Sequence, residues 1–196
     1  PQLAQMLRAC SEKSTRPIVL DPVGVGASAF RLQSCLRLCQ QGVSAIRGNA
    51  SEVMALARMV AKQRGVDSGD DTNAALLAAQ TLSADHHCLV VVTGKIDWVC
   101  SANGVWQIIH GHEWMTQVTA MGCALSAVLA ALMTLPVSPE QAAIAACACY
   151  GKAGLLSASL AAGPGSFAMH FLDCLAQVPQ KTQPCWQIEE GSACAV

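Results

Sequence analysis

The first half of the chain alternates short apolar segments with amphipathic stretches. Ile18–Leu20 and Val43–Ile46 have the length of strands, and Cys88–Thr93 has the continuous apolar character of a strand that is buried on both faces. Helical patterns lie near residues 3–10, near 30–41, after Asn49 and near 72–84. This alternation of strand and helix predicts an α/β fold with a mostly parallel sheet.

The second half of the chain adds an antiparallel element and further helices. Apolar and polar residues alternate on both sides of Asn103-Gly104 and predict a β-hairpin over residues 95–109, at an edge of the sheet. Helical patterns follow near 122–135, 138–159 and 166–178. No linker or internal repeat interrupts the pattern, so we expect a single domain over residues 1–180. The polar, unpatterned residues 181–196 are predicted to form a disordered tail.

Composition narrows the class of protein. The 196 residues are 53% hydrophobic but only 4% aromatic, which favours a core of closely packed helices. A net charge of −1 without a basic cluster argues against a nucleic-acid partner. The apolar run near 123–135 ends at Pro136 and is shorter than the ~20 residues of a membrane helix, which argues against a membrane. The 11 cysteines are scattered without a Cys-x-x-Cys pair, so we expect reduced thiols in the cytoplasm.

Polar side chains follow each of the three apolar segments. Asp21 follows the first, Arg47, Asn49 and Glu52 end or follow the second, and Thr93 ends the third. In open α/β sheets, ligands bind beyond the carboxyl ends of the strands. Asp21 and Glu52 suit Mg²⁺, which takes one or two carboxylates together with substrate phosphates. Because Arg47 adds a fork for phosphate oxygens, this end of the sheet is predicted to be a nucleotide-phosphate site.

Each of these residues also has a purely structural interpretation. Asp21 precedes a proline and suits a plain turn, and Glu52 with Asn49 forms a capping-box pattern at a helix start. Arg47 suits a surface charge at a strand end, and Thr93 suits a plain strand exit. Taken singly, the structural interpretations are the more common ones. Only the joint placement at successive strand ends favours a ligand site.

A cysteine stands at the start of a later helix. After the turn Thr-Ala-Met-Gly, Cys123 falls in the first turn of an Ala/Leu-rich helix. Free N–H groups and the helix dipole favour negative charge there, the dipole by ~0.3–1 kcal/mol. A phosphate, an oxyanion or a thiolate at Cys123 would be stabilised, and a thiolate acts as a base or a nucleophile. The alternative is a buried, inert thiol in a plain turn.

Six short motifs occur in one order along residues 17–178. They are Leu-Asp-Pro-Val-Gly-Val-Gly-Ala from Leu20, Ala-Ile-Arg-Gly-Asn-Ala-Ser-Glu from Ala45, Arg-Gly-Val-Asp-Ser from Arg64, Val-Val-Val-Thr-Gly from Val90, Gly-Cys-Ala-Leu-Ser-Ala from Gly122 and Gly-Pro-Gly-Ser-Phe from Gly163. In this order and spacing they resemble the hydroxyethylthiazole kinase family of the ribokinase-like superfamily. Each motif alone is weak, whereas six in register are specific.

The resemblance implies a fold, a reaction and a set of site residues. The implied fold is a three-layer α/β/α domain. The implied enzyme is a cytoplasmic homotrimer that transfers the γ-phosphate of ATP to the hydroxyl of 4-methyl-5-(2-hydroxyethyl)thiazole in thiamine biosynthesis or salvage. The implied roles are ATP binding for Arg47, Thr93 and Asn49, Mg²⁺ binding for Asp21 and Glu52, a substrate-binding anion hole at Ala120, Met121 and Gly122, and a catalytic base at Cys123, where sugar kinases of the superfamily carry an aspartate.

Two features depart from the family pattern. The turn is usually Gly-Thr-Gly-Cys or Gly-Ala-Gly-Cys, but here it is Ala120-Met121-Gly122-Cys123. If the first position requires a positive φ, alanine costs ~1–2 kcal/mol there, and Met121 adds bulk at the anion hole. Family members also carry an N-terminal region with a first strand and thiazole-binding residues, which we expect to be missing before Asp21. These departures leave open a truncated or degenerate homologue that binds nucleotide or oligomerises without turnover.

Overall fold

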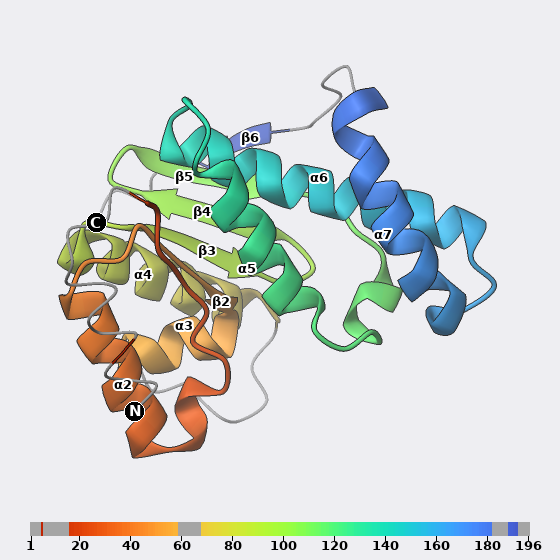
Figure 1. Ribbon diagram of the computed structural model, residues 1–196. Coiled ribbons are helices and arrows are strands. Elements are labelled where there is room, and N and C mark those ends of the chain that lie inside the picture. Colours follow the sequence, from red (N-terminus) through yellow and green to blue (C-terminus); the bar gives the residue numbers. More distant parts are fainter. Residues whose placement is uncertain (1–4, 6–15, 59–67, 182–187, 192–196) are drawn as a thin grey trace.

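The computed structural model describes residue 5 and residues 16–58, 68–181 and 188–191. Its strands are β1 (Val19–Leu20), β2 (Ala45–Asn49), β3 (Leu89–Thr93), β4 (Asp97–Ser101), β5 (Gly104–Ile108) and β6 (Ile188–Gly191). Its helices are η1 (Val25–Ala27), α2 (Ala29–Gln40), α3 (Ala50–Leu56), α4 (Ser68–His86), η2 (Glu113–Thr116), α5 (Met121–Leu132), α6 (Pro139–Leu160) and α7 (Pro164–Lys181). Figure 1 shows their arrangement around one central sheet.

The sheet has the strand order β1-β2-β3-β4-β5-β6. β1, β2 and β3 are parallel, with Leu20 opposite Ile46 and Arg47 opposite Val91. β4 runs antiparallel to β3, β5 antiparallel to β4, and β6 antiparallel to β5. The sheet is therefore mixed rather than mostly parallel as predicted, since two strand pairings are parallel and three are antiparallel. The carboxyl ends of β1, β2 and β3 and the first residue of β4 meet at one end of the sheet.

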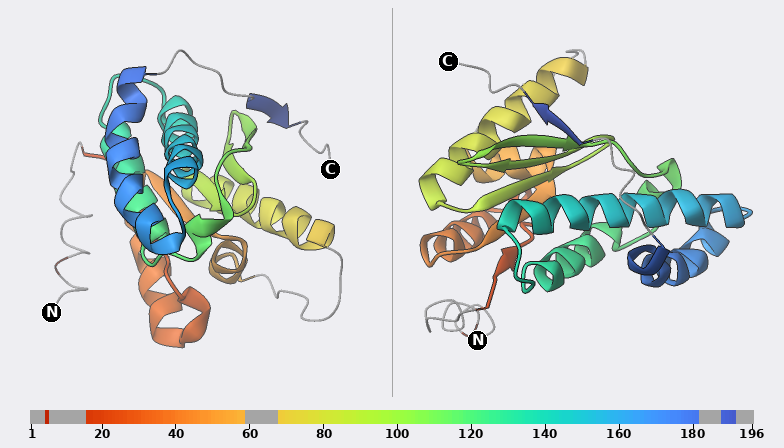
Figure 2. Two further views of the ribbon diagram at one scale, coloured as in Figure 1. Left: turned by 90° about the vertical axis from the view of Figure 1, so that its right-hand side faces the viewer. Right: turned by 90° about the horizontal axis from the view of Figure 1, so that it is seen from above.

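Alternate strand residues face two separate hydrophobic cores. Ile46 and Val90 belong to the core that α2, α3 and α4 cover. Ala45 and Val91, their neighbours along β2 and β3, belong to the core that α5, α6 and α7 cover. This period of two follows from the pleat of a strand, and Figure 2 shows the helices on the two faces of the sheet. The predicted three-layer α/β/α fold is confirmed.

The predicted elements are confirmed with shifts at their ends. At the start of α3, Asn49 Oδ1 accepts from the Glu52 N–H at 2.9 Å and Glu52 Oε2 accepts from the Asn49 N–H at 3.0 Å, which is the predicted capping box. The hairpin turn lies one residue earlier than the Asn-Gly pair suggests, because Ser101 is opposite Gly104. The helical pattern near residues 3–10 lies outside the described residues, residue 5 apart.

The C-terminal segment differs from the predicted disordered tail. α7 continues to Lys181, and residues 188–191 form β6, with Ile188 opposite Ile108 of β5. A strand at the edge of a sheet presents unpaired backbone N–H and C=O groups, and pairing with them needs no hydrophobic periodicity in the added segment. The pattern therefore missed β6, and the hairpin is not the edge of the sheet. Residues 182–187 and 192–196 lie outside the described part of the chain.

In the described part of the chain, one helix has the length and apolar composition needed to cross a membrane, and this is α6. Half of its most apolar stretch is buried within the structure. Ala146 and Ala153 of α6 are fully buried in the core shared with α5 and α7. At Gly151 an added Cβ would lie 2.6 Å from the Cβ of His110, so small residues allow close packing here. These contacts are those of a core helix in a layered α/β fold.

Candidate active site

Three parallel strands place one polar side chain each at or near their carboxyl ends. Arg47 of β2 donates from Nη2 to Thr93 Oγ1 at 2.6 Å, and its Nη1 lies 3.4 Å from Oδ2 of Asp21, which follows β1. The Thr93 hydroxyl in turn donates to the carbonyl oxygen of Gly48 at 3.3 Å. The parallel register thus brings together Asp21, Arg47 and Thr93, as expected for residues at successive strand ends.

The Arg47 guanidinium is buried, so its interpretation as a surface charge is wrong. Its side chain is 10% exposed, and its Nε is buried without a hydrogen-bond partner. A Cβ on Gly122 would lie 2.6 Å from Nη1, so glycine at this position lets the guanidinium press against the backbone of α5. An unsatisfied buried donor costs ~1–3 kcal/mol. A buried guanidinium whose Nε is an unpaired donor is suited to an anion that accepts from it.

The first turn of α5 adds further donors beside this guanidinium. Its N-cap, Ala120, has φ 68° and ψ 6° and makes no side-chain capping hydrogen bond. The first hydrogen bond of the helix runs from the Ala124 N–H to the Ala120 carbonyl oxygen. The amides of Met121, Gly122 and Cys123 therefore have no acceptor within the helix, and such amides at a helix start are suited to phosphate.

The thiol of Cys123 is exposed, so its interpretation as a buried cysteine is wrong. Other thiols of the chain, such as those of Cys88 and Cys100, are buried instead. Burial raises the pKa of Cys88 to about 11 and the pKa of Cys100 to about 12. These two side chains are buried in the core, where they act as small apolar groups. Among the described cysteines, Cys123 is the one at a helix start that faces solvent.

Glu52 joins two loops through backbone hydrogen bonds. Its Oε1 accepts from the Gly24 N–H at 3.0 Å, and its Oε2 accepts from the Asn49 N–H at 3.0 Å. The carboxylate thus ties the loop after β1 to the junction of β2 and α3. The structural interpretation of Glu52 as part of the helix start is correct, and the bond to Gly24 adds a second anchor. Its predicted role in holding a metal stays a prediction.

Asp21 is the carboxylate in this site that fits a divalent cation. Its Oδ2 contacts Ser126 and Arg47, whereas its Oδ1 is buried without a hydrogen-bond partner. An unpaired carboxylate oxygen is a ligand that Mg²⁺ prefers. The described residues hold no group of at least three His, Cys, Asp or Glu side chains that could form a metal site. A cation at Asp21 would therefore take most of its ligands from water and phosphate, as Mg²⁺ commonly does.

Asp97 is a site residue that sequence reasoning missed. It is the first residue of β4, and its Oδ1 accepts from the Gly94 N–H at 3.0 Å. Burial raises the pKa of Asp97 to about 6, against the lowering effects of the Gly94 hydrogen bond and of the positive charge of Arg47. The hairpin signal could have found it, because β4 must start at the end of the sheet where β3 finishes.

Two more residues reach the site from helices. Ser126 of α5 donates to Asp21 Oδ2 at 2.8 Å. Tyr150 of α6 donates to the Met121 carbonyl oxygen at 2.7 Å, and its hydroxyl lies 3.8 Å from Met121 Sδ. Burial raises the pKa of Tyr150 to about 12, so the phenol stays a neutral donor. The side chain of Met121 is turned toward Tyr150 and packs on the core, which accommodates the bulk expected at the anion hole.

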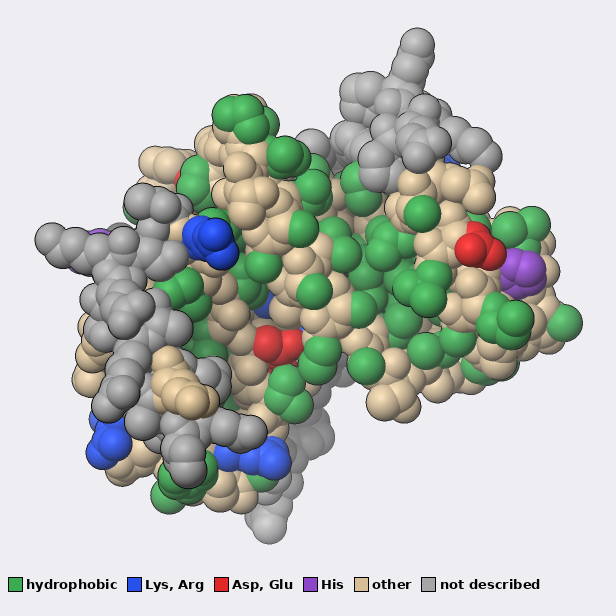
Figure 3. Space-filling view, in the orientation of Figure 1, with side chains coloured by type: hydrophobic (Ala, Val, Ile, Leu, Met, Phe, Trp, Pro, Cys, Tyr) green, Lys and Arg blue, Asp and Glu red, His purple; other side chains and the backbone are tan. Residues whose placement is uncertain are grey.

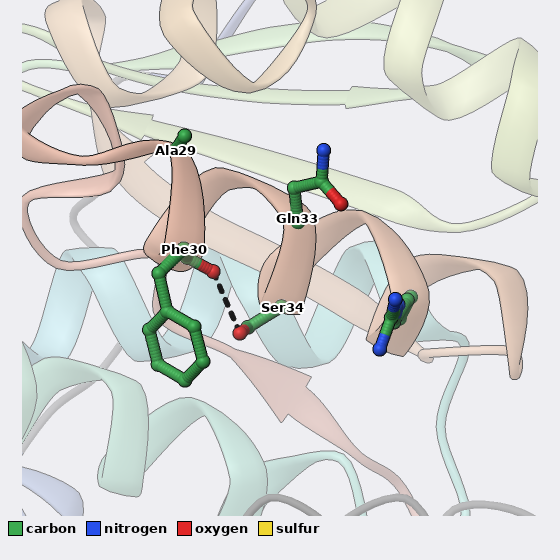
Figure 4. A pocket seen from close by; sticks show the side chains of 5 residues that line it. Ala29, Phe30, Gln33 and Ser34 are labelled. Carbon is green, nitrogen blue, oxygen red and sulfur yellow. Dashed lines mark hydrogen bonds between the residues drawn. The ribbon is translucent and has the colours of Figure 1, made fainter.

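A pocket lies elsewhere, along α2. It is lined by Ala29, Phe30, Gln33, Ser34 and Arg37, and the Ser34 hydroxyl donates to the carbonyl oxygen of Phe30 at 2.7 Å (Figure 4). The lining contains neither a carboxylate nor any residue predicted for the site. The pocket is therefore not part of the candidate active site.

We expect Ala120→Gly to stabilise the protein. Relief of ~1–2 kcal/mol of left-handed strain is offset by the ~0.5–1 kcal/mol entropic cost of glycine, so the free energy of unfolding should rise by about 0.5–1 kcal/mol. Urea denaturation measures the change. The matched control is Ala127→Gly in the same helix, which should lower stability by about 1 kcal/mol. Equal losses for both variants would contradict the strain at Ala120.

Asp97→Asn tests the raised pKa of Asp97. When the pKa of a carboxyl is higher in the folded than in the unfolded protein, its ionisation destabilises the folded state. The free energy of unfolding of wild type should therefore fall relative to that of the variant between about pH 4 and pH 6. We expect the variant to gain about 2–3 kcal/mol over this interval, measured by denaturant unfolding at several pH values.

Glu140→Gln is the control of opposite sign. The pKa of Glu140 is lowered: burial raises it, but hydrogen bonds from its own backbone, Asn103, Ser101 and Ser138 outweigh this effect. Wild type should therefore be the more stable protein above the ordinary pKa of a glutamate, and this advantage should fade as the pH falls. A stability difference for Asp97→Asn that does not change with pH would contradict the burial effect.

Comparison with known sequences finds one family. Residues 2–181 match the model of the hydroxyethylthiazole kinase family. Hydroxyethylthiazole kinase of Psychrobacter sp. (strain PRwf-1) is 51% identical over 160 residues, which are 81% of this chain and 60% of that protein. Hydroxyethylthiazole kinase of Escherichia coli O127:H6 is 43% identical over 180 residues, which are 92% of this chain and 70% of that protein. The chain thus spans about three fifths of the length of the Psychrobacter relative.

Solved structures agree with these matches. The hydroxyethylthiazole kinase protein from Pyrococcus horikoshii OT3 superposes with a TM-score of 0.83 at 27% identity, covering 97% of this chain and 72% of that one. Pyridoxal kinase from Staphylococcus aureus, in complex with AMP-PCP and pyridoxal, shares the fold with a TM-score of 0.59 at 20% identity, covering 78% of this chain and 58% of that one. By the family match over most of its length, the chain belongs to the hydroxyethylthiazole kinase family.

Proposed function

We propose that this chain carries the kinase site of a hydroxyethylthiazole kinase, which transfers the γ-phosphoryl group of ATP to the hydroxyl of 4-methyl-5-(2-hydroxyethyl)thiazole. The observation that carries the proposal is the buried Arg47 guanidinium, whose Nη1 would contact any Cβ at Gly122 in the first turn of α5. A cation and free helix amides at one point suit a transferring phosphoryl group. The names of the relatives, which are 43–51% identical, support the same reaction.

Arg47, Thr93 and Asn49 are proposed to bind ATP. Arg47 would use its unpaired Nε, together with its Nη groups, on phosphate oxygens, and its bond to Thr93 fixes the plane of the guanidinium. Asn49 is exposed at the start of α3, where its Oδ1 accepts from Ser51 and Glu52. Phosphoryl transfer depends on positioning and on neutralising charge, and this group of residues supplies both.

A divalent cation, Mg²⁺ with ATP, is proposed to bind at Asp21. The unpaired Oδ1 of Asp21 would be its protein ligand, and Glu52 would hold the adjoining loop through Gly24. When bound, the cation neutralises phosphate charge and orients the transferring group. Asp21 and Arg47 would then bind groups of opposite charge, since Asp21 would bind the cation and Arg47 the phosphate.

Cys123 is proposed as the general base. Its exposed thiolate would accept the proton of the thiazole hydroxyl while that oxygen forms a bond to the γ-phosphorus and the bond to the leaving ADP oxygen breaks. The amides of Met121, Gly122 and Cys123, with Ala120 as N-cap, would face the developing negative charge.

Cys123→Ala should lower the turnover number by about 10²-fold or more while ATP binding persists, because a positioned base contributes ~10²–10⁴-fold. Thiazole phosphorylation and calorimetric ATP binding measure the two effects. Cys35→Ala, in α2 on the other face of the sheet, is the control and should keep full turnover. If the wild-type chain binds ATP without phosphorylating thiazole, it is a homologue that binds nucleotide without turnover.

We further propose that the chain assembles with copies of itself. Leu156 and Leu160 of α6 are 39% and 62% exposed, and Met169 and Leu172 of α7 are 74% and 67% exposed. Figure 3 shows hydrophobic side chains gathered over the part of the surface where α5, α6 and α7 lie. Exposed apolar groups of this kind mark contact surfaces between proteins. The family resemblance suggests a trimer, and the cytoplasm as its compartment.

The double variant Met169→Glu/Leu172→Glu should shift the chain to a monomer, because two buried carboxylates are unfavourable at an apolar interface. Light scattering after size-exclusion chromatography measures the mass. Leu77→Glu on α4, where the side chain is 48% exposed, is the control and should leave the mass unchanged. A monomeric wild type would contradict self-assembly.

A further inference from the structure

Ser126 connects the start of α5 to the carboxylate at the end of β1. Its side chain is buried, one turn after Gly122 in α5. Its hydroxyl donates to Asp21 Oδ2 at 2.8 Å and lies 3.4 Å from the Gly122 carbonyl oxygen. The shorter contact is the stronger one, so the single hydroxyl proton is directed at Asp21. A serine inside a helix commonly donates to the carbonyl oxygen four residues earlier, and Ser126 makes this bond only weakly.

The bond from Ser126 decides which oxygen of Asp21 stays available. Arg47 Nη1 approaches the same Oδ2, but at 3.4 Å, which is long for a charge-assisted hydrogen bond. Ser126 is therefore the close partner that sets the rotation of the carboxylate. With Oδ2 engaged, Oδ1 is left buried and without a partner. Loss of the hydroxyl would leave Asp21 free to turn and pair both oxygens with Arg47.

We propose that Ser126 is a positioning residue for the metal step of the kinase, because it holds Asp21 Oδ2 and so presents Oδ1 to the divalent cation. The inference rests on the proposed function. Ser126 touches neither cation nor substrate in this role and acts through Asp21. Hydrogen-bonding partners of metal ligands commonly contribute 10–100-fold to metal affinity. The same contact links the position of Asp21 to that of the α5 start, where Cys123 lies.

The test compares Ser126→Ala, Ser126→Thr and wild type. We expect Ser126→Ala to weaken Mn²⁺ binding about tenfold, measured by electron paramagnetic resonance with the nonhydrolysable analogue AMP-PCP. Ser126→Thr keeps the hydroxyl and should bind Mn²⁺ within about threefold of wild type. In turnover assays the half-saturating Mg²⁺ concentration should rise by the same factor for Ser126→Ala, with the KM for thiazole unchanged.

Ser157→Ala is the matched control. Ser157 is a fully buried helical serine whose hydroxyl donates to the Ala153 carbonyl oxygen of its own helix at 2.6 Å, so its loss should leave Mn²⁺ binding unchanged. If Ser126→Ala does not fold, Ser126→Cys keeps the volume with a weaker donor and should bind Mn²⁺ more weakly than Ser126→Thr.

The outcomes distinguish the role of Ser126 from the proposed kinase function. Wild-type Mn²⁺ affinity in Ser126→Ala, or an equal loss in Ser126→Thr, overturns the role of the hydroxyl and leaves the proposed function intact. Failure of wild type to bind Mn²⁺ with AMP-PCP overturns the metal site at Asp21 and the inference with it. A tenfold loss that the threonine variant restores supports both.

Discussion

A buried guanidinium organises this end of the sheet. Arg47 lies between Asp21, Thr93 and the backbone of Gly122, and its Nε has no hydrogen-bond partner. Asp21 contacts the guanidinium through a single oxygen at 3.4 Å, and Asp97 also interacts with its positive charge. A buried donor without a hydrogen-bond partner, such as this Nε, is unfavourable until an acceptor reaches it. The unpaired Nε is therefore the feature of the fold that supports the proposed anion site.

Several residues of the surrounding elements contact Arg47 or the groups that Arg47 touches. A Cβ at Gly122 would displace the guanidinium, so glycine there lets Arg47 keep its position; Thr93 is a hydrogen-bond acceptor for Arg47 as well as a donor to Gly48. Ser126 and Tyr150 then hold the two sides of the α5 start, one through Asp21 and the other through the Met121 carbonyl oxygen. Ser126, Asp21, Arg47 and Thr93 thus form one chain of hydrogen bonds, and Tyr150 holds the neighbouring turn of α5.

Residues at strand ends were predictable from the sequence, because parallel strands bring their carboxyl ends together whatever the details of packing. Asp21, Arg47 and Thr93 are of this kind. Ser126 and Tyr150 could not be found in this way, since their contacts depend on how α5 and α6 pack on the sheet. The same limit applies to β6, whose pairing with β5 is made by backbone groups and leaves no hydrophobic period. Asp97 lies between these cases, because the hairpin signal implied its position.

Ala120 and Met121 are the residues that set this chain apart from its family pattern, and the structure shows what they change. Ala120 adopts the left-handed conformation that glycine would adopt more easily, so the turn keeps its shape and the substitution acts on free energy. Met121 turns its side chain toward Tyr150, and its amide stays at the start of α5. Both departures therefore leave the amides of the first turn in place beside Arg47. The backbone amides and the guanidinium that are proposed to bind phosphate are therefore independent of the two side chains that differ.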